Sequence, residues 1–357
     1  MRKLIGAGLL AAALAAGAAP ASAQQAPQQL KADQDAAAKQ VQQQRTQPGN
    51  NAPVWGEVRS GAPQYTTDRG VEAGVLVQSR GETWRQARVP VAFWGGLLVA
   101  VALAGLAVFY LLRGTMTIDE PPTGRVIQRF SGADRAAHWL LAITWVVLAI
   151  TGLILSLGKA VLLPVIGYTL FAWLAVFAKN LHNFVGPVLI VAVPWMFIRY
   201  VRDNGVSFED VKWFMNIANF LKGHDYPSGR FNGAEKLLFW LLLVVLTTVL
   251  VITGLILNFP NFGQGRAAMQ TANLVHMIAA YVAIALAAVH IYVGTIGVKG
   301  AYQGMRTGYV DETWAKHHHE RWYEDVKAGR ARQKFVVPGE PAAGKPPVAA
   351  SRAAPQG

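Results

Sequence analysis

The stretch LVHMIAAYVAIALAAVHIYVGTIG, residues 274–297, decides the fold. It is almost wholly apolar, and as a helix it is long enough to cross the roughly 30 Å hydrocarbon core of a bilayer. Its two histidines, His276 and His290, are fourteen residues apart, which corresponds to about 21 Å of rise and to positions within about 40° of one face. One face of one membrane helix therefore offers two imidazoles at two depths.

Four further apolar stretches precede this one, and we predict that each crosses the membrane as a helix. Their predicted bounds are 91–112, 138–157, 182–201 and 237–258. Of all residues, 53% are hydrophobic and 15% are charged, a balance typical of membrane proteins and unusual for a soluble domain. The predicted fold class is an all-α membrane protein: a four-helix transmembrane bundle within residues 113–300, preceded by one extra N-terminal transmembrane helix.

The remaining segments are expected to lie outside the hydrocarbon. Residues 1–23 combine a basic start, an apolar stretch and a small-residue site, the pattern of a cleaved signal peptide. Residues 24–90 are predicted to be a periplasmic segment, and their Gln-, Ala- and Pro-rich part, up to about residue 52, is predicted to be disordered. The apolar stretch 161–177 is interrupted by Pro164 and Gly167, which favours an interfacial or re-entrant piece.

Lysine and arginine are distributed unevenly between the two sets of loops. One set, which includes the C-terminal tail at 301–357, holds most of them, whereas the opposite loops hold only Lys159, Lys179 and Arg266. Basic loops remain in the cytoplasm, and a signal peptide followed by five crossings gives the same orientation. We therefore expect a multi-pass protein of a bacterial inner membrane, with a periplasmic N-terminal segment and a cytoplasmic tail.

Depth and helix direction assign the four intramembrane histidines to two pairs. His182 and His276 each open a helix that runs from the periplasm to the cytoplasm, so their imidazoles lie level near the periplasmic surface. His138 begins the second span at the cytoplasmic side, at the depth that His290 reaches near the end of the fifth. The predicted pairs are His182 with His276 and His138 with His290.

Paired imidazoles inside a membrane point to haem iron. The chain has no cysteine, which excludes thioether-linked haem and cysteine-held iron–sulfur clusters. Zinc favours four ligands close together, and histidines can also serve only as hydrogen bonds between helices; two well-separated pairs favour two b haems. Two axial imidazoles leave no open position on an iron, which favours electron transfer over substrate chemistry. We predict no catalytic residue in the chain.

Other polar or small residues admit two interpretations each. The sequence ITGLIL at 150–155 recurs at 252–257, and its glycines make room either for a flat macrocycle or for close helix contact. Arg135, one turn before His138, either pairs with a haem propionate or sets topology. The run His317, His318 and His319 is expected on a solvated or partner-facing surface rather than at a metal.

From about residue 124 to 330 the sequence resembles the cytochrome b (gamma) subunit of membrane-bound formate dehydrogenases. The matching pieces are DRAAHW at 134–139, LHNFVG at 181–186, RFNGAEK at 230–236, the His276 and His290 pair, VKGAYQGM at 298–305 and WAKHHHERWY at 314–323. The resemblance covers a little over half of the chain. The N-terminal segments and the first span lie outside it.

The resemblance implies a relay of electrons between three subunits. A molybdenum- or tungsten-containing catalytic (alpha) subunit would oxidise formate, and an iron–sulfur (beta) subunit would pass electrons to this chain. His182 and His276 would hold the haem nearer the iron–sulfur subunit, and His138 with His290 the haem nearer the quinone that accepts the electrons. Asn232 and Gly233 would anchor that quinone.

One departure affects the quinone site. Relatives tend to have the order N-A-G-Q-K where this chain has Asn232-Gly233-Ala234-Glu235-Lys236. Asn232 still offers an amide donor to a quinone carbonyl. Glu235 either delivers protons or serves as a helix-start acid.

Two rival hypotheses remain from the sequence. Cytochrome b subunits of nickel–iron hydrogenases or thiosulfate reductases also pair histidines on four helices, and only the FNGAEK and HHHERWY motifs argue against them. A haem-free membrane anchor or transporter, whose histidines only join helices, is the alternative of a different class.

Overall fold

The computed structural model describes residues 79–221 and 225–336, together with residues 31, 34–36, 38–39, 42, 55–56 and 59–61. The chain divides into two compact units, Met1–Thr83 and Trp84–Gly357. The predicted signal peptide lies outside the described residues, and so does most of the predicted linker at 24–52; the described residues of that linker are helical. Its predicted disorder therefore stays a prediction.

The predicted membrane-spanning architecture is confirmed in the described part of the chain. Five helical spans are long and apolar enough to cross a bilayer: Thr83–Arg113, Gly132–Val161, Leu163–Asp203, Gly233–Asn258 and Arg266–Gly297. In the most apolar 18-residue part of each span, at most 28% of the residues are buried inside the protein. The apolar side chains therefore mostly face outward, as they do when lipid replaces water as the solvent.

The spans are built from the following elements. They are α4 (Ser79–Arg113), α5 (Gly132–Val161), α6 (Leu163–Val185), η1 (Gly186–Val188), α7 (Leu189–Tyr200), η2 (Val201–Asp203), α10 (Gly233–Leu237), the π-helical η3 (Leu238–Thr247), α11 (Thr248–Asn258), α12 (Arg266–Tyr292) and the π-helical η4 (Val293–Gly297). Helices α5, α7, α11 and α12 lie beside one another, and α4 packs on α12 through Val99, Met277 and Tyr281.

Helix α5 begins before the predicted start at residue 138 because a capping box satisfies its first backbone N–H groups. The side chain of Ser131 accepts a hydrogen bond from the backbone N–H of Asp134, whose carboxylate accepts one from the N–H of Ser131. Asn232 and Glu235 form the same reciprocal pair at the start of α10. The polar residues at the starts of α5 and α10 therefore act as helix caps.

The stretch 161–177, predicted to be an interfacial or re-entrant piece, is helical from Leu163 onward and forms the first part of α6; its position relative to a membrane stays a prediction. Pro164 lies in the first turn, where a missing N–H costs no hydrogen bond. Gly167 adopts non-helical dihedral angles, with a φ of 76°, so a kink there separates a short first helical piece from the rest of α6. The third span is accordingly 41 residues long, and it is bent at η1, where Pro187 lies, and again near Pro194 in α7.

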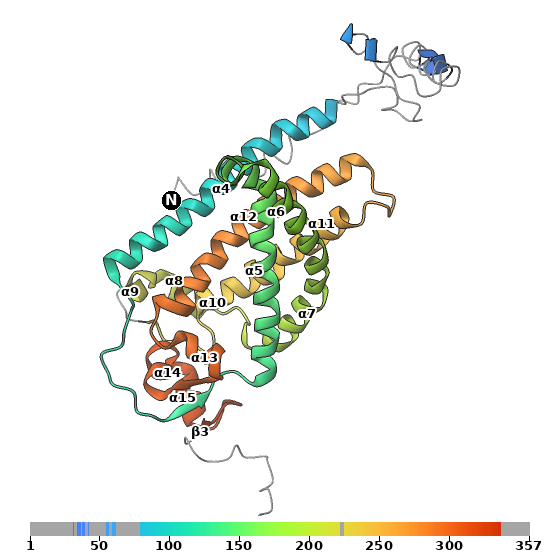
Figure 1. Ribbon diagram of the computed structural model, residues 1–357. Coiled ribbons are helices and arrows are strands. Elements are labelled where there is room, and N and C mark those ends of the chain that lie inside the picture. The colour runs from blue at the N-terminus through green and yellow to red at the C-terminus, as the bar shows by residue number, and fades with distance from the viewer. Residues whose placement is uncertain are drawn as a thin grey trace, which may run out of the picture. The chain divides into compact units, whose positions relative to one another are not determined.

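The predicted tail folds, as far as residue 336, into a cap at one end of the bundle, at the bottom of Figure 1. The cap contains α8 (Phe208–Met215), α9 (Ile217–Leu221), α13 (Ala301–Thr307), α14 (Glu312–His318) and α15 (Glu320–Lys327). It also contains an antiparallel sheet of order β2–β1–β3, formed by Tyr309–Asp311, Val126–Gln128 and Phe335–Val336. Ile127, Trp314 and Trp322 are buried in its core.

The histidine run does not lie on a solvated surface, which corrects that expectation. His319 is only 2% exposed, and its Nδ1 lies 2.8 Å from the carbonyl oxygen of Gly229. Burial, reinforced by the positive charge of Arg129, lowers the pKa of His319 to about 3, so this imidazole is neutral at physiological pH. Three adjacent histidines in the sequence gave no signal that the segment folds back into a core.

Gly308 holds the cap against the start of α5, and its replacement should destabilise the protein. Its φ is 95°, and an added Cβ would lie 2.6 Å from the carbonyl oxygen of Phe130. Left-handed backbone costs a residue with a Cβ about 1–2 kcal/mol, and the overlap adds about 1–3 kcal/mol. We predict that Gly308→Ala lowers the free energy of unfolding by about 2–5 kcal/mol, measured by denaturant unfolding in detergent.

Gly124→Ala is the matched control. Gly124 has a φ of 78° but no atom within 4 Å of an added Cβ, so it isolates the backbone term of about 1–2 kcal/mol. Equal losses in both variants would contradict a role for the close approach to Phe130.

Candidate functional site

Two imidazoles face each other where α6 meets α12. The ring centroids of His182 and His276 are 6.2 Å apart, and the rings are inclined by 73°. Each ring is partly buried. The structure therefore brings together the histidines that depth and helix direction assigned to the first pair.

Each ring of this pair contacts a threonine from a neighbouring helix. Thr151 Oγ1 lies 2.8 Å from His182 Nδ1 and donates to the carbonyl of Val147, also at 2.8 Å. Thr253 Oγ1 lies 2.9 Å from His276 Nδ1 and donates to Val249. Because a hydroxyl has one proton, and the backbone carbonyl accepts it, each Nδ1 must donate its own. The other ring nitrogen, Nε2, is then left with a lone pair for a metal.

The glycines after these threonines make room for the same rings. A Cβ added to Gly152 would lie 3.4 Å from Cε1 of His182, and one added to Gly254 would lie 3.4 Å from Cε1 of His276. Each copy of the Ile-Thr-Gly sequence thus contacts one imidazole through its threonine and leaves space for the ring at its glycine. Sequence reasoning noted the glycines and overlooked Thr151 and Thr253, although the repeat contained both.

The second pair lies fourteen residues further along α12. His138 and His290 have ring centroids 6.2 Å apart and ring planes inclined by 54°. The buried Nδ1 of His138 has no hydrogen-bond partner among the described residues. His138 also packs edge-on against Trp139, whose indole donates to the carbonyl of Met305 in α13. The cap therefore supports this pair from outside.

The separation within each pair fits two axial ligands of one metal. A metal bound by two opposite imidazole nitrogens at about 2.0–2.1 Å, each about 1.1 Å from its ring centre, separates the centroids by about 6.3 Å. Both observed separations are 6.2 Å. The rings are too far apart for a direct hydrogen bond to each other, so a hydrogen bond between the two histidines of a pair does not explain their approach. The residues present fit two metal-centred groups, each held by one pair.

The residues predicted to anchor a quinone lie at the start of α10. Asn232 Oδ1 accepts the backbone N–H of Glu235, while its Nδ2 group is not used in that cap. Gly233 is buried, and an added Cβ would lie 3.1 Å from the ring of Trp213. Glu235 accepts hydrogen bonds from Asn232 N and from Arg129. The capping role foreseen for Glu235 is thus present in the structure.

Arg135 reaches the cap: its Nη1 donates to the carbonyl of Arg306 at 2.7 Å. Its Nε is buried without a hydrogen-bond partner among the described residues. The side chain therefore joins the first turn of α5 to the end of α13, one turn away from His138.

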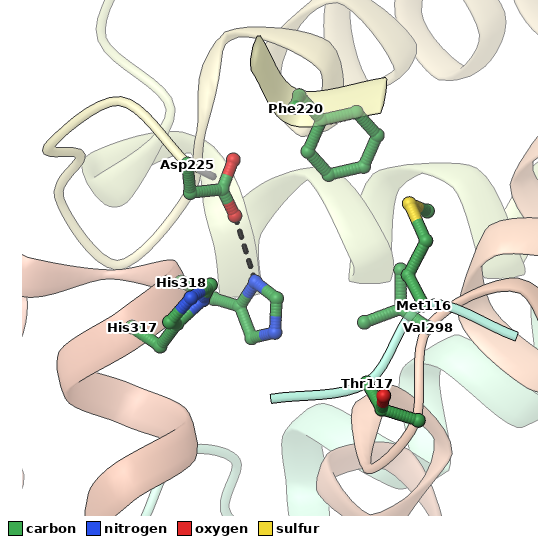
Figure 2. A pocket seen from close by; sticks show the side chains of 7 residues that line it. All are labelled: Met116, Thr117, Phe220, Asp225, Val298, His317 and His318. Atoms are coloured by element: carbon green, nitrogen blue, oxygen red, sulfur yellow. Dashed lines mark hydrogen bonds and ion pairs between the residues drawn. The ribbon is translucent and has the colours of Figure 1, made fainter. Parts of the chain in front are cut away.

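A small cavity in the cap is lined by His317, His318 and Asp225 together with apolar side chains (Figure 2). His318 Nδ1 is bonded to Asp225 at 2.8 Å. Across the described residues, no group of three or more His, Asp or Glu side chains is arranged to hold a metal ion. The cavity is thus bordered by a hydrogen bond between His318 and Asp225 within the cap.

The spans, the paired imidazoles and the threonine contacts define a helical membrane protein with two histidine pairs along α12. A family model described as prokaryotic cytochrome b561 matches residues 129–308, just over half of the chain. The chain belongs to the prokaryotic cytochrome b561 family. Membership in a cytochrome b family implies binding of haem b.

Curated relatives cover most of the same region. The chain is 30% identical over 221 residues to the cytochrome b556(Fdn) subunit of the nitrate-inducible formate dehydrogenase of Escherichia coli K12, covering 59% of this chain and 96% of the relative. It is 32% identical over 210 residues to the cytochrome b556(fdo) subunit of a formate dehydrogenase of that strain, covering 56% and 93%. A formate dehydrogenase cytochrome b556 subunit of Haemophilus influenzae is 28% identical over 223 residues, covering 59% and 88%.

Removing a threonine hydroxyl should weaken the hold on haem. We predict that Thr151→Val or Thr253→Val lowers haem affinity about 10- to 100-fold, because the histidine loses the group that fixes its tautomer and orientation. The rate of haem transfer to excess apomyoglobin measures the change. Thr144→Val, a buried threonine of α5, should transfer haem at the wild-type rate; an equal effect there would contradict the tautomer argument.

Proposed function

We propose that this chain is the membrane cytochrome b subunit of a respiratory formate dehydrogenase. In this role it passes electrons from an iron–sulfur subunit through two b haems to quinone. The observation that carries the proposal is the presence of two imidazole pairs, each at 6.2 Å, at two depths along α12. The names of the relatives supply the partner enzyme.

The proposed haem ligands are His182 with His276 and His138 with His290. A bound haem b accepts and releases one electron at a time. Two protein imidazoles would hold each haem, which would supply electron transfer rather than substrate chemistry, so in this proposal the chain itself does not oxidise formate. Thr151 and Thr253 hold the first pair in the tautomer that presents Nε2.

The proposed orientation places the cap in the cytoplasm and the Lys159, Lys179 and Arg266 side in the periplasm of a bacterial inner membrane. Its support is the concentration of basic residues at the cap end. Electrons from a catalytic alpha subunit and an iron–sulfur beta subunit would then enter at His182 and His276. They would leave at the cap end, near His138 and His290.

The proposed quinone contact is Asn232, whose amide nitrogen can donate to a quinone carbonyl while Oδ1 caps α10. Gly233 contributes close packing against Trp213 rather than a polar contact. With the proposed orientation, quinone reduction takes protons from the cytoplasm after electrons have crossed the membrane. The two movements together would conserve energy as a transmembrane potential.

The haem count tests the ligand assignment. In a pyridine haemochrome assay, the wild-type chain should contain two haems, and His182→Ala or His138→Ala should each contain one. His276→Ala should lose the same haem absorption component as His182→Ala, and His290→Ala the same component as His138→Ala. His318→Gln, a histidine of the cap, should retain two haems. A variant of any paired histidine that retains two haems would contradict the assignment.

The orientation and the partner enzyme are tested separately from haem binding. An alkaline phosphatase fused to the C-terminus should be inactive, because the cap is cytoplasmic, and a green fluorescent protein at the same position should be fluorescent. Membranes containing the complex should reduce the haems on addition of formate and not hydrogen. Haem reduction by hydrogen, with co-purification of a nickel–iron enzyme, would overturn the formate assignment and leave the haem ligands in place.

A further inference from the structure

A cavity of about 570 Å³ opens at the cap end of the bundle, outside both histidine pairs. It lies between the first turn of α5, the end of α7 and the segment after α15. Its volume is within the roughly 300–1,000 Å³ of small-molecule sites. Five arginines line it: Arg129, Arg199, Arg202, Arg230 and Arg332.

Two of these arginines are buried and form ion pairs within the protein. The side chains of Arg129 and Arg230 are only 5% and 8% exposed. Arg129 pairs with Glu235, and Arg230 pairs with Asp203 and Asp134. They form the floor of the cavity and give it a fixed shape.

The other three arginines remain accessible. Arg199 is 38% exposed and pairs with Asp134, and Arg332 is 64% exposed and pairs with Asp203. Arg202 is exposed and forms no ion pair with another described residue. Three carboxylates, those of Asp134, Asp203 and Glu235, neutralise three of the five charges. The cavity therefore carries an excess of two positive charges and selects an anion.

Exposed apolar side chains lie at the edge of the cavity. Ile198, in its lining, is 69% exposed. Val191, two helical turns away on the same face of α7, is 63% exposed. A ligand with an anionic head and long hydrocarbon chains would place the head among the arginines and the chains along this face. Arg199 and Arg202 lie at the end of a membrane span, the depth at which phospholipid phosphates lie.

We propose that this cavity, the arginine cavity, binds the headgroup of an anionic phospholipid from the leaflet at the cap end. Guanidinium groups bind phosphate through paired N–H donors, and basic pockets beside transmembrane helices are suited to such headgroups. The bound lipid phosphate would offset part of the excess charge and join α5, α7 and the segment after α15. The site is independent of the haem ligands, of the electron donor and of the orientation.

The test uses the haem-loaded full chain in detergent, with lipid binding followed by native mass spectrometry. Wild-type protein should bind one phosphatidylglycerol more tightly than phosphatidylcholine. Arg202→Gln/Arg332→Gln should weaken phosphatidylglycerol binding by about 30-fold, since each basic residue near a lipid surface contributes about 1 kcal/mol. Phosphatidylcholine binding should not change.

The double variant Arg113→Gln/Lys299→Gln is the matched control. It removes two exposed charges from α4 and from the segment after η4 without altering the cavity lining, and its phosphatidylglycerol affinity should stay within about 3-fold of wild type. The single variant Arg202→Gln breaks no ion pair among the described residues, so it should not disturb folding. It should weaken phosphatidylglycerol binding by about 5-fold. Haem spectra should be unchanged in every variant.

Three outcomes would overturn the proposal. Equal loss of phosphatidylglycerol in the cavity and control variants would reduce the effect to general surface charge. Inorganic phosphate that binds as tightly as the lipid and displaces it would make the cavity a site for free phosphate. Loss of a partner subunit by the cavity variant, with lipid binding intact, would assign the arginines to an acidic protein segment.

Discussion

The need to satisfy polar rings inside lipid is the constraint on which the rest of this structure depends. An imidazole in the hydrocarbon cannot bond to water, so a ring nitrogen that finds no partner within the protein is costly. For His182 and His276 the partners of Nδ1 are the hydroxyls of Thr151 and Thr253. Gly152 and Gly254 let the helices approach closely enough for those contacts. Threonine and glycine at these positions are therefore explained by the histidine ring that each contacts.

The two pairs differ in the support that their rings receive. The first pair is held by hydroxyls from within the bundle, whereas His138 has no hydroxyl partner and packs against Trp139, which is bonded to α13. Arg135 makes a second connection to α13. One histidine pair is thus supported by the membrane helices alone, and the other depends on the cap. If each pair holds a haem as proposed, this difference would give the two haems different potentials, since ligand hydrogen bonding and solvent access tune each one.

Depth and helix direction were enough to predict which histidines meet, because both follow from hydropathy and from the rise of a helix. Three features of the structure could not be predicted from hydropathy and helix geometry. Helix α6 continues beyond a kink at Gly167, although Pro164 and Gly167 are residue types that usually end helices. The cap forms from short segments far apart in the chain, such as β1 and β2. His319 is buried by contacts with Gly229 and Glu235, which no local pattern reveals.

The basic residues that indicate orientation also have structural roles at the cap end. Arg230 bonds to Asp203, Asp134 and the carbonyl of Arg129, and Arg129 bonds to Glu235, so two of the counted charges are neutralised within the fold. Topology is decided during insertion, before these pairs exist, so the count in the sequence remains the relevant quantity. After folding, the exposed Arg202 differs from its neighbours because no carboxylate in the described chain pairs with it. Charges left over in this way are the ones available to lipid.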